Sequence, residues 1–180
     1  MKEFQLWTYL MHSDLHCMSA FEMIRSGMGH QELTRLRRFG VWHLTFESDE
    51  DQRSTISTMI DQSYYLVNPN KEAYFLDGIP AKDSIDLSRR LNLKVSPKHQ
   101  SSNESLVARL RDRFKVDLLT ATRSLVWEMQ LSEPSDSLTI QKTFMSAVSG
   151  SVSRTKGFLV QPLFETYEWL DVDQVYTGIS

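Results

Sequence analysis

Two nine-residue stretches of this sequence follow one pattern: LVNPNKEAY at residues 66–74 and LVQPLFETY at residues 159–167. Both fit L-V-[N/Q]-P-x-x-E-x-Y, and 93 positions separate them (159 minus 66). A second pair, RFGVW at residues 38–42 and RSLVW at residues 123–127, is separated by 85 positions (127 minus 42). Because the two pairs occur in the same order along the chain, the pattern indicates a tandem duplication.

The hydrophobic periodicity predicts the same order of elements in both halves. Apolar residues alternate in strands and recur every three to four positions in helices. The first half is predicted to contain strands at 3–11, 32–39, 41–48 and 73–76, with helices at 17–28 and between Ser48 and Pro69. The second half is predicted to contain strands at 91–95, 116–122, 125–131 and 164–169, with helices at 105–114 and 140–148. Asn103 is a candidate N-cap for the helix that follows it.

The middle two strands of each half are predicted to form a hairpin, with Gly40 at the turn of the first one. The resulting order, βαββαβ, is that of the ferredoxin-like arrangement. We therefore predict an α+β fold of two tandem ferredoxin-like units, at residues 1–79 and 89–180, joined by a linker at 80–88. Each unit is small for one core, so the two are expected to pack together as a pseudo-dimer.

The apolar positions of these elements also predict which side chains are buried. The predicted core residues are Leu33, Leu44, Phe46, Ile56, Ile60, Leu118, Met129, Phe144 and Val148.

Several of these stretches resemble the PurS family, the small subunit of phosphoribosylformylglycinamidine synthase in purine biosynthesis. The similar segments are AFE at 20–22, Met28-Gly29, Leu33, Leu36-Arg37, VWHLTF at 41–46 and the two closing motifs at 66–74 and 159–167. Because of these similar segments, we describe the two predicted units as PurS-like. The chain departs from the family at the hairpin, where the family's Gly-Lys is replaced by Gly40-Val41, and the second half has no glycine at this point.

The resemblance implies a non-catalytic structural subunit that bridges a glutaminase and an ATP-dependent synthetase and supports ammonia transfer between them. It also implies that the chain is a divergent tandem copy, and we expect it to form a homodimer that docks on these two enzymes. One alternative from another class stays open: a stand-alone ligand-binding or regulatory module on a duplicated ferredoxin-like fold. A weaker third hypothesis is an RNA-binding protein.

Four residues are candidates for binding a partner protein: Arg37, Arg38, Trp42 and Trp127. The similar family strand carries an arginine near Arg37 and Arg38, and guanidinium groups suit carboxylate or phosphate recognition. Tryptophan is enriched at the hot spots of interfaces. Solvated arginines and buried tryptophans are the structural alternatives to this role.

Composition and motifs exclude several other classes. The 180 residues are 41% hydrophobic with a net charge of −3, which is typical of a globular protein and argues against nucleic acid as a partner. No apolar stretch is long enough for a membrane span and no signal-peptide pattern is present, so we expect a cytoplasmic protein. Walker, nucleophile-elbow and HExxH motifs are missing, and Cys17 is the single cysteine. The sequence thus predicts no catalytic residue, no cofactor and no metal site.

Overall fold

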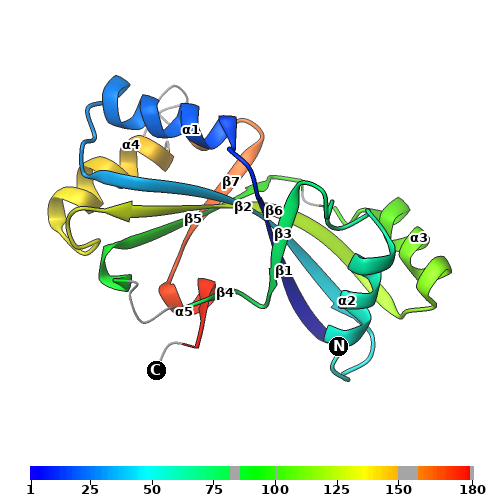
Figure 1. The fold of residues 1–180 in the computed structure, drawn as a ribbon. Coiled ribbons are helices and arrows are strands. Elements are labelled where there is room, and N and C mark those ends of the chain that lie inside the picture. Colours follow the sequence, from blue (N-terminus) through cyan, green and yellow to red (C-terminus); the bar gives the residue numbers. More distant parts are fainter. Residues whose placement is uncertain (82–85, 100, 150–157, 179–180) are drawn as a thin grey trace.

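A six-stranded antiparallel sheet in the order β3-β1-β2-β6-β5-β7 forms the centre of the molecule (Figure 1). The computed structural model describes residues 1–81, 86–99, 101–149 and 158–178. The strands of this sheet are β1 Lys2–Leu10, β2 Leu33–Phe46, β3 Glu72–Leu76, β5 Arg90–Pro97, β6 Leu118–Leu131 and β7 Glu165–Leu170. Two short strands, β4 Ile79–Pro80 and β8 Tyr176–Thr177, pair in parallel.

Helices complete an α+β fold, as the sequence predicts. The α-helices are α1 Leu15–Glu22, α2 Arg53–Gln62, α3 Glu104–Phe114, α4 Met145–Ser149 and α5 Val172–Val175. The π-helices are η1 Met23–Gly27, which continues α1, and η3 Ile140–Phe144, which leads into α4, and η2 Leu87–Arg89 is a 3-10 turn. Of the predicted linker at 80–88, residues 82–85 lie outside the described part of the chain.

The two predicted hairpins are wrong, because each is one continuous strand of 14 residues. Gly40 lies inside β2 and pairs with Leu125, so it makes no turn. In the second half, β6 likewise runs through Ser124 without interruption. Each half of the chain therefore has the order βαβαβ, and the long strands β2 and β6 lie side by side at the centre of the sheet (Figure 1).

Residues that correspond at the sequence offset of 85 take equivalent places in the pairing of β2 with β6. Arg38 pairs with Trp127, and Trp42 pairs with Arg123. Residues 38 and 42 correspond to 123 and 127 at that offset, so the two pairs are equivalent and surround the central pair of Gly40 and Leu125. The register shifts of this ladder lie at its two ends, between Leu33 and Arg35 and between Thr45 and Phe46.

The two closing motifs also make equivalent contacts at the offset of 93. The N–H of Asn68 donates to the Glu72 carboxylate at 2.8 Å, and the N–H of Gln161 donates to the Glu165 carboxylate at 2.7 Å. The strands that follow take equivalent places at the two edges of the sheet. The L-V-[N/Q]-P-x-x-E-x-Y pattern is thus a turn in which the glutamate caps the backbone before an edge strand.

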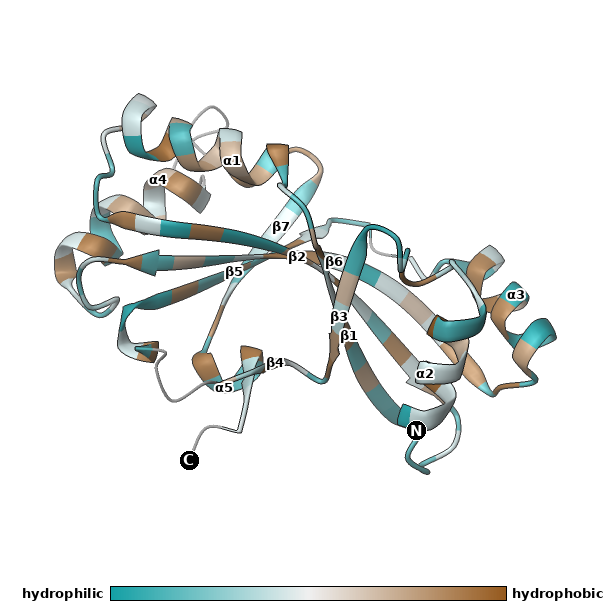
Figure 2. Cartoon of the chain, in the orientation of Figure 1, coloured by the Kyte–Doolittle hydropathy of each residue, from teal (hydrophilic) through white to brown (hydrophobic). Residues whose placement is uncertain are grey.

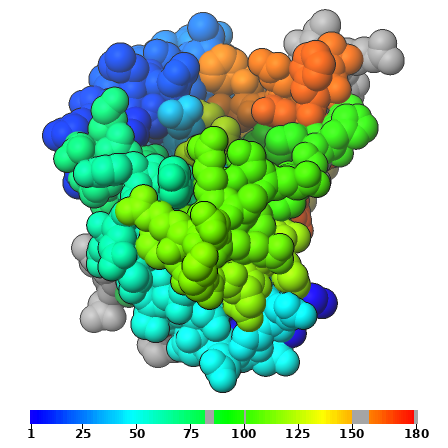
Figure 3. Space-filling model, turned by 90° about the vertical axis from the view of Figure 1, so that its right-hand side faces the viewer, coloured from blue at the N-terminus to red at the C-terminus, as the bar shows by residue number. Residues whose placement is uncertain are grey.

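Helices α1 to α4 lie in two groups, and each group combines both halves of the chain. Lobe A contains α2 and α3 over β1, β3 and the adjoining ends of β2 and β6, and lobe B contains α1 and α4 over β5, β7 and the opposite ends of β2 and β6 (Figure 1). Each core cluster draws on both halves: Ile56 of α2 and Leu110 of α3 share one cluster, while Ile24 and Phe144 share the other. Figure 3 shows residues of the first half, in blue and cyan, packed directly against green and orange residues of the second half.

All nine predicted core residues are buried, which confirms the periodicity on which they were chosen. Along β2, Leu36, Trp42 and Leu44 belong to the cores beneath the helices, whereas Phe39 and Val41 point to the opposite face. The alternation of hydrophobic and polar residues along the strands is visible in Figure 2. Such alternation follows from the two-residue period of a strand.

The face of the sheet opposite helices α1 to α4 is covered at its centre by the C-terminal segment, which contains α5 and β8. Val175 and Tyr176 are buried there against Trp7, Phe39 and Val126. Gly78 has φ +129, and an added Cβ would lie 2.9 Å from the carbonyl oxygen of Val175. A glycine at this point lets the backbone before β4 approach the C-terminal segment closely.

Candidate functional site

An open cleft of about 400 Å³ lies between the two lobes, on the helix-bearing side of the sheet. Its lining includes Gly40 and Leu125, the central pair of the ladder between β2 and β6. We call it the central cleft. Its charged lining residues are Asp14, Arg38, Glu72, Arg123 and Glu165, and its apolar ones include Leu10, Val95, Pro97 and Leu125.

Arg38 is held in the cleft by two contacts. Its Nε and Nη2 donate to the two carboxylate oxygens of Asp14 at 2.9 and 3.1 Å, and its guanidinium lies 5.7 Å from the ring centroid of Trp127. Asp14 is also the N-cap of α1, where it accepts from the N–H of Cys17 at 3.1 Å. This bidentate geometry fixes the guanidinium plane and leaves Nη1 outside the ion pair.

Arg123 occupies the equivalent position from the second half, with its guanidinium 5.2 Å from the ring centroid of Trp42. Gly40 makes room for it: an added Cβ would lie 2.8 Å from Nη2 and 3.2 Å from Nε of Arg123, and 3.0 Å from Oγ1 of Thr8. Real Cβ atoms essentially never approach another heavy atom more closely than 3.0 Å. Glycine at position 40 therefore lets the guanidinium lie directly on the strand.

We expect Gly40→Ala to destabilise the protein by about 1 kcal/mol, because the added methyl would displace the Arg123 guanidinium from Trp42, and a cation–π contact at an exposed site contributes about this much. The measurement is urea unfolding of Gly40→Ala, Arg123→Ala and the double variant. The glycine substitution should cost less free energy of unfolding in the Arg123→Ala background. An equal cost in both backgrounds would show that this contact does not select glycine.

Two glutamates from equivalent turns line the same cleft. Glu72 begins β3 and Glu165 begins β7, and one carboxylate oxygen of each is engaged by the backbone turn described above. Both side chains are half-buried. The arrangement combines guanidinium groups with carboxylates that keep one oxygen outside the turn, so the cleft has donors and acceptors of opposite charge in one cavity.

Of the four sequence-predicted partner residues, Arg38 lies in the lining of the cleft. Arg38 pairs with Trp127 across the β2–β6 ladder, whereas Trp42 belongs to the other core cluster and contacts Arg123. The indoles of Trp42 and Trp127 are buried, at 8% and 7% exposure, as in the structural alternative stated for these tryptophans. The reason is that each ring lies beneath a helix pair and an arginine. Arg37 points to the opposite face of the sheet, since it is one residue from Arg38 on the same strand.

Arg37 belongs to a buried charged cluster that sequence reasoning missed. Its guanidinium makes a bidentate ion pair with Glu128, whose side chain is fully buried. Tyr176 donates its hydroxyl to the same carboxylate, and Nη1 of Arg90 lies 3.4 Å from it. Burial alone would raise the pKa of Glu128, but the hydrogen bonds and charge of Arg37 outweigh it and lower the pKa overall. The cluster ties β2, β5 and β6 to the C-terminal segment.

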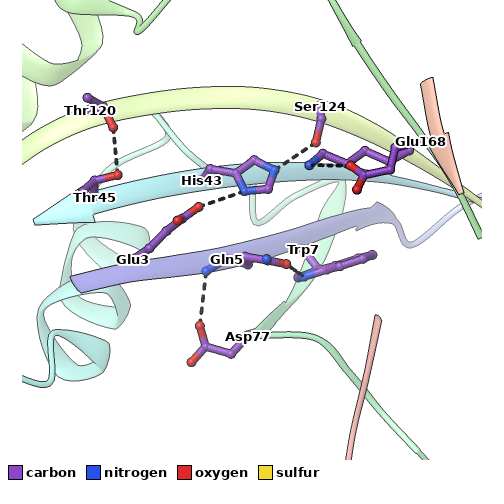
Figure 4. A network of polar contacts seen from close by, with 10 residues as sticks. Glu3, Gln5, Trp7, His43, Thr45, Asp77, Thr120, Ser124 and Glu168 are labelled. Carbon is purple, nitrogen blue, oxygen red and sulfur yellow. Dashed lines mark hydrogen bonds and ion pairs between the residues drawn. The ribbon is translucent and has the colours of Figure 1, made fainter. Parts of the chain in front are cut away.

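A second polar network on that face joins Glu3, His43 and Ser124 (Figure 4). Nδ1 of His43 lies 3.3 Å from the Glu3 carboxylate, and Nε2 lies 3.1 Å from the hydroxyl of Ser124. Burial and the nearby Lys94 ammonium lower the pKa of His43, so the imidazole is neutral at pH 7.

The order acid, imidazole and hydroxyl is also that of a nucleophilic triad, but the surroundings favour a structural role. Ser124 is 2% exposed within a central strand. Ser124 also lines the central cleft, but the pocket that it shares with His43 measures about 100 Å³, well below the roughly 300 Å³ of the smallest usual ligand sites. We therefore assign the network to holding β1, β2 and β6 in register.

Among the described residues, neither Cys17 nor a metal-ligating group of side chains provides a second candidate site. Burial, and then the Asp14 carboxylate, raise the pKa of Cys17 to about 11, and its thiol donates to the carbonyl of Leu36. A thiol with this pKa is unreactive at neutral pH. Within the described residues no three His, Cys, Asp or Glu side chains are grouped so that they could hold a metal ion. Among the same residues no helix has the length and apolarity needed to cross a membrane.

Comparison with known proteins identified no similar protein. No protein-family model matches the chain, and neither a curated protein nor a solved structure matches it.

Proposed function

We propose that the chain is a tandem duplication of two PurS-like, ferredoxin-like units that have exchanged their first helices. The repeated pairing of β2 with β6 and the repeated closing turns support this. If each long strand replaces the two strands of a hairpin, each lobe holds four strand segments and two helices, the content of one βαββαβ unit. The exchange of an identical element between two copies is domain swapping, here within one chain.

We further propose that the protein acts as a non-catalytic, PurS-type subunit of phosphoribosylformylglycinamidine synthase. It would bridge the glutaminase and the ATP-dependent synthetase, and support ammonia transfer between them. The observation that carries the proposal is the closing motif: both copies of the family-like pattern occupy equivalent turns at the two edges of the sheet. The edge strands β3 and β7 that follow each have one side free of a strand partner within the described sheet, and such edges are natural docking surfaces.

The test is light scattering of the purified chain, alone and mixed with the glutaminase and synthetase. We expect a homodimer of the 20.9 kDa chain, and a larger complex when both enzymes are present. The glutamine-dependent activity of the synthetase should require the chain. A strict monomer would refute the homodimer, and the absence of any complex with both enzymes would refute the subunit role.

The central cleft favours a second function, a stand-alone ligand-binding module. Its volume of about 400 Å³ lies within the range of small-molecule sites. Its lining combines apolar walls with a few charged groups, each oriented by its own partner. Binding of a small molecule to the isolated chain, without either enzyme, would support this function.

A further inference from the structure

We infer that the central cleft binds a small zwitterion that carries one carboxylate and one ammonium group, of the α-amino acid class. This inference rests on the second proposed function, the ligand-binding module. It follows from which charged atoms line the cleft, which of their hydrogen-bonding positions are already used, and how large the cavity is.

The carboxylate of the ligand is expected at Arg38. This guanidinium uses Nε and Nη2 for Asp14, so the Nη1 group is the part that can serve a ligand. The side chain of Arg38 is 24% exposed, which is enough for a small molecule to reach it while the stacking on Trp127 keeps its plane fixed. A preoriented guanidinium binds a carboxylate with little loss of side-chain entropy.

The ammonium group of the ligand is expected at Glu72 or Glu165. In each glutamate Oε2 accepts the backbone N–H of the closing turn, which holds the carboxylate in place and leaves Oε1 as an acceptor. The two glutamates come from equivalent turns of the two halves. A ligand can therefore meet a carboxylate from either side of the cleft.

The balance of charge selects against other ligands. A dianion would lie against three carboxylates, those of Asp14, Glu72 and Glu165, and a dication would lie against the guanidinium groups of Arg38 and Arg123. Like charges held close together at a binding site cost affinity. A molecule with both charges satisfies both kinds of group, and the apolar walls offered by Leu10, Val95, Pro97 and Leu125 suit an aliphatic side chain.

The experiment is isothermal titration calorimetry of the full chain with four probes: L-leucine, L-glutamine, succinate and putrescine. We expect one of the two amino acids to bind with 1:1 stoichiometry and more tightly than either doubly charged probe. Arg38→Gln should weaken that binding at least about tenfold, and so should at least one of Glu72→Gln and Glu165→Gln. Arg35→Gln is the matched control, because Arg35 lies on the same strand, is exposed and does not line the cleft.

Folding of each variant is checked by circular dichroism, since Arg38 also contacts the N-cap of α1. If Arg38→Gln is unfolded, the two glutamate variants together carry the comparison with Arg35→Gln. Tighter binding of succinate or putrescine would overturn the zwitterion but retain a ligand-binding cleft. Equal binding by the Arg35 and cleft variants would place the ligand elsewhere and overturn the inference. No binding of any probe would overturn the inference, while co-purification with the two enzymes tests the subunit role separately.

Discussion

A fragment of residues 1–79 is expected to have no stable folded monomer. Its helix α1 packs in lobe B, where the buried partners include Leu93, Met129 and Phe144 of the second half. Without them the apolar face of α1 and the adjoining end of β2 would be exposed to water. Each fully buried side chain of this kind contributes about 1.5–3 kcal/mol, and a domain is stable by only about 5–15 kcal/mol in total.

Circular dichroism and light scattering of the fragment test this expectation. Residues 1–79 and 89–180, expressed together, provide the control and should recover the cooperative thermal unfolding of the whole chain. A folded form of 1–79 alone should occur only as a dimer, in which a second copy of β2 replaces β6. A monomeric fragment with a cooperative unfolding transition would show that the halves fold independently.

The second large effect is expected for Glu128→Ala, which should lower the free energy of unfolding by about 3–5 kcal/mol. The substitution leaves Arg90, whose side chain is 6% exposed, without its counter-charge, and breaking a buried ion pair from one side costs about this much. It also removes the acceptor for Arg37 and Tyr176. Urea unfolding measures the difference.

Glu168→Ala is the matched control for that experiment. Glu168 lies at the edge of the same sheet, is 59% exposed and forms an ion pair with Lys94 at 3.6 Å. Surface ion pairs contribute about 0–1 kcal/mol, so this variant should be close to wild type. An equal loss of unfolding free energy in the two variants would mean that the burial of Glu128 does not determine the size of the effect.

The dependence of stability on acid pH should also reflect the Glu128 carboxylate. The folded-state pKa of Glu128 is lower than its unfolded value, so its stabilisation is present above the unfolded pKa of about 4.3. That stabilisation is lost as the pH falls below this value through the folded pKa. Glu128→Ala should therefore lose less stability between about pH 5 and pH 3 than wild type does. An unchanged acid dependence would contradict this assignment.

Local patterns predicted the parts of the fold that depend on short stretches of chain. The predicted helix at 105–114 corresponds to α3, and Asn103 caps it by accepting from the N–H of Leu106. The offsets of 85 and 93 matched residues that make equivalent contacts in space. Burial of residues such as Leu44 and Met129 followed from periodicity, because side-chain direction repeats with the backbone geometry.

The candidate site was only partly predictable, because local patterns do not show which distant segments come together. Arg38 was selected from a resemblance, but its counterpart Arg123 became evident only when β2 and β6 paired. The buried cluster of Arg37, Arg90 and Glu128 joins three strands from both halves. Charged residues on strands usually face solvent, so nothing local to these positions indicated that they would be buried.

By itself the sequence determined the α+β class, the repeated pattern, most elements and the core residues. The continuity of β2 and β6, and the presence of helices from both halves in each lobe, became evident only in the tertiary structure. A hairpin and a single long strand have the same two-residue alternation, and Gly40 fits a turn as well as a close approach by Arg123. The choice between a hairpin and a single long strand depends on pairing with a strand about 85 positions away. The free energy of that pairing comes from contacts between segments that are distant in the sequence.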